Sequence, residues 1–161
     1  MRRFIVPAVA LALVAVVMAF RPAPDETFDA SALEGAWTAV HIDAVTQDST
    51  WTRDEERPNM LLFSGGHWAS VRVAGDGSRA ELPEDPTDEQ RLEAWRPFQA
   101  SGGSYSVSGS TISSTTLIAK NPNRMGDDWD SEFKMDGEKL VRVFSNSENT
   151  NSWTVTYKRM K

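Results

Sequence analysis

The sequence predicts an all-β protein, an eight-stranded antiparallel up-and-down barrel with one short helix between its third and fourth strands. Apolar and polar residues alternate from residue 37 almost to the end of the chain, which is the period of half-buried strands. Glycine turns at Gly65-Gly66, Gly109 and Gly137 each separate two β-rich runs. Antiparallel strands in this order close into a barrel wide enough for packed side chains or one small ligand, and a β-sandwich is the alternative.

The N-terminus predicts export. Arg2 and Arg3 precede an uncharged run of 17 residues, and Val17 and Ala19 occupy the small-residue positions of a signal-peptidase site. We therefore expect residues 1–19 to be a signal peptide and the mature protein to be periplasmic or extracellular. An uncleaved N-terminal membrane anchor is the alternative, although a run of 17 residues that contains Pro7 is shorter than the about 20 residues that a bilayer requires.

Composition limits the partners of the mature chain. Residues 20–32 are rich in Pro, Asp, Glu, Ser and Thr and predict a flexible tether before a single domain at 33–161. Without Arg2 and Arg3 the formal net charge changes from −6 to −8, which disfavours nucleic acid and anionic membrane as partners. We expect no stable membrane insertion after cleavage. The chain has no cysteine, so its stability must come from burial and not from disulfides.

The predicted strands are joined mostly by hairpins. One long connection, residues 74–100, contains the helix signal: Thr87 to Gln90 form a capping box, and Arg96-Pro97 ends the helix. Leu92 and Trp95 share a face of this helix, and we expect that face to dock on the flank or end of the barrel or to act as a lid. The expected strands span residues 37–45, 59–63, 67–73, 103–107, 111–119, 129–135, 139–145 and 153–159.

Several stretches of the domain resemble a known family. The run from Leu33 to Trp37 and the last predicted strand, from Trp153 to Arg159, resemble the lipocalin or calycin pattern. The stretches 66–75, 103–109, 119–122 and 132–138 are similar to those of bacterial secreted lipocalin-like domain proteins without an assigned activity. The resemblance covers about residues 33–161 and implies the barrel fold and an interior ligand, although it names no ligand. It also implies that the first-strand tryptophan fills the closed end and that a basic residue of the last strand lies across it.

Physical chemistry supports the same closing pair. The narrow end of a barrel must be filled, and an indole under a cation gains apolar burial together with about 0.5–2 kcal/mol of cation–π attraction. Arg159 shares a strand face with Trp153 and Tyr157, so we expect it to be the cation over Trp37. Lys158 is the alternative if the register slips by one residue.

Six side chains are candidates for a ligand cavity. Arg72 alternates with Trp68 on one side of its strand, and an inward Arg72 would require a carboxylate partner or an anionic ligand. The other orientation turns Ala69, Val71 and Val73 inward and leaves Arg72 in water. The candidates are Trp68, Arg72, Tyr105, Phe133, Phe144 and Tyr157.

The sequence contains little that supports catalysis. The chain has two histidines and no cysteine, and the His41 and Asp43 pair on one strand face is expected to be structural. We expect no enzyme activity, no metal and no cofactor, and an isomerase or hydrolase site at the barrel mouth is the alternative. The favoured function is binding of a small apolar or amphipathic molecule as the partner, and a solid barrel that acts through its surface is the alternative. An interior void of about 300 Å³ or more would favour the ligand.

Overall fold

The computed structural model describes residues 30–79, 81–146, 148 and 150–161. The predicted signal peptide and the tether up to residue 29 lie outside the described residues. Within the tether range, residues 30–32 belong to a short 3₁₀-helix, η1 (Ala30–Leu33), which a single residue, Glu34, joins to the first strand. No helix in the described part of the chain is long and apolar enough to cross a membrane.

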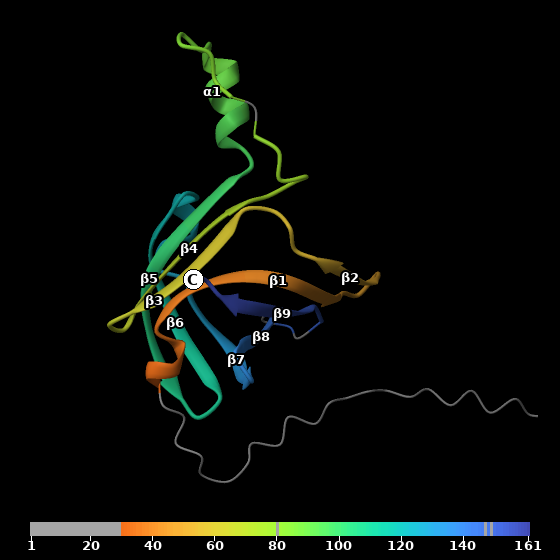
Figure 1. Cartoon of the computed structure of the whole chain (residues 1–161), viewed down its shortest axis with the longest axis vertical. Helices are drawn as coiled ribbons and strands as arrows, with labels where there is room; N and C mark the ends of the chain where they lie inside the picture. Colours follow the sequence, from red (N-terminus) through yellow and green to blue (C-terminus); the bar gives the residue numbers. More distant parts are fainter. Residues whose placement is uncertain (1–29, 80, 147, 149) are drawn as a thin grey trace, which may run out of the picture.

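The structure is a closed antiparallel β-barrel (Figure 1). Its nine strands form one sheet in the order β2-β1-β3-β4-β5-β6-β7-β8-β9, and an additional pairing of β1 with β9 closes it. Eight of these strands form the barrel, as the sequence predicts, and β2 is attached to the side of β1. The strands are β1 (Gly35–Val45), β2 (Thr50–Asp54), β3 (Asn59–Ser64), β4 (His67–Val73), β5 (Phe98–Ser108), β6 (Thr111–Ala119), β7 (Asp128–Asp136), β8 (Lys139–Ser145) and β9 (Ser152–Arg159).

Strand β2 was not expected from the sequence. It is a polar run, and all of its residues are exposed, so it carries no alternation that could reveal it. It forms because β3 covers only Gly35–Trp37 on one edge of β1. The far half of that edge, from His41 to Val45, pairs instead with β2, which satisfies backbone groups that would otherwise be left to solvent.

One end of the barrel is filled with apolar side chains. This closed-end core combines residues from η1 and from six strands, because inward-facing positions alternate along each strand. Trp37 is the largest of its fully buried side chains. The closed-end core consists of Leu33, Trp37, Leu61, Phe63, Trp68, Ile112, Phe133 and Leu140.

Trp37 and Arg159 meet at this end. They are register partners across β1 and β9, and the Arg159 guanidinium carbon lies 4.2 Å from the centroid of the indole. Lys158 pairs with Thr38 instead. Arg159 also donates to the carbonyl oxygen of Ala32 at 2.8 Å and to that of Glu34, so it ties the 3₁₀ turn to the last strand.

The glycine of the Gly-x-Trp step has a steric reason. Gly35 has φ +115°, a conformation that other residues rarely adopt. A Cβ at this position would lie 2.7 Å from Nη1 of Arg159. Gly35 therefore leaves the space through which the guanidinium reaches the carbonyl groups of the turn.

The helix α1 (Asp88–Trp95) lies between β4 and β5, which are the third and fourth strands of the barrel. Its capping box is present, with Thr87 and Gln90 bonded reciprocally. The expected docking of its apolar face is wrong, since Leu92 is 50% and Trp95 54% exposed and the helix projects away from the barrel (Figure 1). Two large apolar residues in eight offer too little area to hold the helix against the sheet.

We predict that Trp37→Ala lowers the free energy of unfolding by about 3–5 kcal/mol, because it leaves a large cavity in the closed-end core. Arg159→Ala should cost less and should lose part of its effect in the Trp37→Ala background. Urea denaturation followed by circular dichroism on the four proteins of the double-mutant cycle measures the coupling. Strict additivity would contradict the interaction of the two side chains.

Candidate functional site

The other end of the barrel encloses an open cavity of about 680 Å³. Leu61 and Trp68 of the closed-end core lie at its floor, and aromatic residues from β2, β7, β8 and β9 line its walls. This volume falls within the range of small-molecule sites, which is about 300–1,000 Å³. The aromatic lining residues are Trp51, Trp68, Trp129, Phe144, Trp153 and Tyr157.

The charged groups of the cavity are nearly all cationic. Of the 20 acidic residues in the described part of the chain, only Glu55 lines the cavity. A protein with a formal net charge of −6 thus places a cluster of positive charge in its interior. Such a cleft concentrates anions locally. The lining arginines are Arg53, Arg57, Arg72, Arg124 and Arg142.

Glu55 is already occupied by two of these arginines. Arg57 Nε donates to Oε1 of Glu55 at 2.6 Å, and Arg57 Nη2 is paired with the other carboxylate oxygen. Arg53 Nη2 lies 3.3 Å from the same oxygen, Oε2. The hydrogen bonds from Arg57 hold the pKa of Glu55 below its usual value. Glu55 therefore neutralises charge at one side of the cavity only.

Arg142 is the most unusual group in the site. It comes from β8 and is 2% exposed, and burial lowers its pKa to about 10. Nε and Nη2 of Arg142 donate to the hydroxyl of Ser131, at 3.2 and 2.6 Å. In the described chain no carboxylate lies within 4.0 Å of its guanidinium.

Three aromatic rings surround this buried cation. The guanidinium carbon of Arg142 lies 4.7 Å from the ring centroid of Phe144, 5.3 Å from that of Trp129 and 5.5 Å from that of Phe63. Cation–π attraction is stronger for a desolvated cation than for an exposed one. The rings stabilise the charge of Arg142 without neutralising it.

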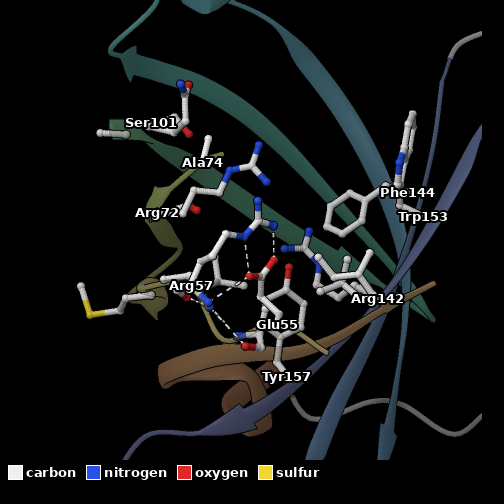
Figure 2. A pocket seen from close by; sticks show the side chains of 18 of the residues that line it. Glu55, Arg57, Arg72, Ala74, Ser101, Arg142, Phe144, Trp153 and Tyr157 are labelled. Atoms are coloured by element: carbon white, nitrogen blue, oxygen red, sulfur yellow. Dashed lines mark hydrogen bonds and ion pairs between the residues drawn. The ribbon is translucent and has the colours of Figure 1, made fainter. Parts of the chain in front are cut away.

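Arg72 and Tyr157 face the same space (Figure 2). Arg72 shares a strand face with the buried Trp68 and lines the cavity, although Arg72 itself is exposed. Pairing of β3 with β4 sets it opposite Asn59. Burial raises the pKa of the Tyr157 phenol, and the charges of Arg142 and Arg72 oppose this shift. Tyr157 is therefore a neutral hydroxyl beside two guanidinium groups.

The structure brings together four of the six candidate residues, Trp68, Arg72, Phe144 and Tyr157. Phe133 lies in the closed-end core and Tyr105 packs against that core, so neither lines this cavity. The Tyr105 hydroxyl donates to Glu34 Oε1 at 3.2 Å instead.

Sequence reasoning missed Arg142, although a signal for it exists. The sequence predicts Phe144 as a cavity residue, and alternation along the strand places Arg142 and Leu140 on the same face. A basic residue between two inward apolar positions was thus visible. Alternation could not show that Glu55, Arg57 and Trp51 line the cavity. Their positions depend on where β2 and the loop after it lie.

His41 lies on the outer surface of the barrel, away from the cavity. Its Nδ1 is 2.8 Å from Asp54 Oδ1, and its Nε2 is 3.3 Å from Asp43 Oδ1. The hydrogen bond to Asp54 raises the pKa of His41 above 6.5. Within the described ranges no group of three or more acidic or histidine side chains is arranged to hold a metal ion.

Comparisons with known proteins assign neither a family nor a function to this chain. No protein-family model matches the sequence, and no curated protein matches it. A lipocalin-like protein from Bacteroides uniformis is similar in structure, with 13% identity, a TM-score of 0.48, and coverage of 80% of this chain and 99% of that one. An uncharacterised protein from Bacteroides eggerthii has 12% identity, a TM-score of 0.44, and the same coverages of 80% and 99%.

We predict that His41 titrates above pH 6.5 and that Asp54→Asn lowers its pKa, because the variant removes the charged acceptor. Because the pKa is higher in the folded state, the stabilisation by this pair is fully present below pH 6.5 and is lost as pH rises through the folded pKa. NMR titration of the imidazole resonances measures the shift, with Asp130→Asn as the control. An unchanged His41 pKa in Asp54→Asn would contradict the pairing.

Proposed function

We propose that this protein binds a small amphipathic molecule in the open end of its barrel. The observation that carries the proposal is the cavity of about 680 Å³, which combines aromatic walls with arginine side chains. Binding sites for small molecules are mostly apolar and contain a few convergent polar groups. The aromatic and aliphatic walls of this cavity match that pattern, and its five arginines make it more strongly charged than such sites.

The cavity supports ligand binding over the alternative of a solid barrel. A barrel without a ligand would be expected to fill its interior with side chains, and the closed-end core of this protein does so. The opposite end keeps a void above the size expected for a ligand site. The indole Nε1 of Trp68, which lines the cavity, is buried and has no hydrogen-bond partner in the described chain.

Binding without catalysis is the second part of the proposal. The cavity lining contains neither histidine nor cysteine, and its one carboxylate, Glu55, accepts hydrogen bonds from Arg57. A carboxylate with a lowered pKa is a weak general base. The titratable groups of this cavity are therefore suited to holding a ligand rather than to transferring protons.

We also propose that the protein acts outside the cytoplasm. The proposal is supported by the charged start, uncharged run and small-residue site in residues 1–19, and by the resemblance to bacterial secreted lipocalin-like domain proteins. In that setting a binding barrel could carry or sense a poorly soluble molecule.

We predict a saturable change in tryptophan fluorescence when the protein is titrated with decanoate, 1-decanol or retinol, because several indoles line the cavity. Ser101→Phe should weaken binding at least tenfold by filling the cavity. Ser106→Phe is the matched control, since it adds the same ring at an exposed position on the same strand. The absence of saturation with every probe would favour the solid-barrel function.

A further inference from the structure

The groups that lack partners in the cavity are all able to donate hydrogen bonds. A guanidinium has five N–H donors, and Arg142 directs only Nε and one nitrogen of its fork to Ser131. Its Nη1 group makes no hydrogen bond within the described chain, and the buried Nε1 of Trp68 also has no acceptor there. A ligand that satisfies these groups must supply acceptor oxygens.

Charge leads to the same requirement. Arg142 and Arg72 have no carboxylate within 4.0 Å in the part of the chain that the structure describes. The aromatic rings around Arg142 attract its charge but are poor acceptors for its in-plane N–H groups. Figure 2 shows both guanidinium groups and the hydroxyl of Tyr157 directed into one space.

The depth of these groups gives the orientation. Arg142 contacts the ring of Phe63, a member of the closed-end core, so it lies near the floor of the cavity. Phe144 follows it on β8 toward the end of that strand, and pairs there with Trp153 at the start of β9. Arg142 is therefore the deep cationic group, and Phe144 and Trp153 lie nearer to the open end. Arg72 lines the same cavity but is itself exposed, so it is not buried at that depth.

From this arrangement we propose that the ligand is an oxyanion with an apolar body and that it enters the barrel with its anionic group first. The anionic group lies between Arg142 and Arg72, where the Tyr157 hydroxyl is a third donor. The apolar body lies against Phe144 and Trp153 toward the mouth. This inference rests on the proposed function and specifies its ligand class.

The test compares three probes of equal chain length, decanoate, decanesulfonate and 1-decanol, by isothermal titration calorimetry. A hydrogen bond to a charged group contributes about 1.5–3 kcal/mol, which corresponds to about 10- to 100-fold in affinity. We expect both anions to bind at least tenfold more tightly than the alcohol. A preference for decanoate alone would restrict the ligand to carboxylates.

Three variants assign the preference to residues. Arg142→Gln and Arg72→Gln should each reduce anion affinity about 10- to 100-fold and leave 1-decanol within about twofold. Arg124→Gln is the matched control: it removes the same charge at the cavity, but Arg124 Nε already has Asp127 as a partner at 2.7 Å. It should leave the affinity for all three probes nearly unchanged.

A measurement on the unaltered protein avoids the risk that Arg142→Gln does not fold. In a sample with ¹⁵N-labelled arginine, decanoate should shift the Arg142 and Arg72 Nε–H resonances at saturation, and 1-decanol should not. Saturable binding of all probes with equal affinity and no such shifts would overturn the anionic subsite and leave the binding barrel intact. Failure of every probe to bind would instead overturn the proposed function itself.

Discussion

The pairing of β1 with β9 is the constraint on which the rest of the structure depends. It joins the two ends of the sheet, from Trp37 opposite Arg159 to Val45 opposite Ser152. Closure removes the free edges that an open sheet of eight strands would expose. It also creates an interior, so that each strand must present one face to a confined volume. The closed-end core and the cavity are both consequences of this single pairing.

The interior is divided into an apolar end and a cationic end. At the closed end, the indole Nε1 of Trp37 donates a hydrogen bond to the carbonyl oxygen of Leu33 at 2.7 Å. The only polar atom of this buried ring therefore has a partner. At the floor of the cavity, Arg142 is held by Ser131 and by aromatic rings, and no carboxylate of the described chain pairs with it. An unpaired buried charge is costly in an apolar medium, so a cavity that admits water or an anion is the environment in which this arrangement is tolerable.

The outer surface and the cavity carry opposite charge. The acidic residues lie almost entirely outside the cavity, and at physiological ionic strength their field is screened beyond about 8 Å. An anion at the mouth therefore meets mainly the local arginines, including Arg53, which stacks 5.0 Å from the ring centroid of Trp51 on β2. Strand β2 thus extends the barrel wall with one aromatic and one cationic side chain.

The elements that depend on local signals could be predicted from the sequence. Glycine turns and alternating strands specified the order of the eight barrel strands, and Thr87 and Gln90 specified the start of the helix. Strand β2 and the exposed helix face could not be predicted, because neither is determined by its own residues. Strand β2 forms because part of the edge of β1 is not covered by β3. The apolar face of the helix stays exposed because no surface of the barrel packs against it.

Only the tertiary structure decided which side chains enter the barrel. Alternation from Trp37 would turn His41 and Asp43 inward, but the register of β1 with β9 shifts between Ala39 and His41, so Ile42 and Ala44 face the interior instead. Arg72 lines the cavity, although it remains exposed, because β3 and β4 pair in one register, and a slip of one residue would turn its side chain to the outer face. The sequence by itself determined the number and order of the eight barrel strands, since turn and strand signals are local. The cationic site arises from pairings between distant segments, and no local pattern encodes them.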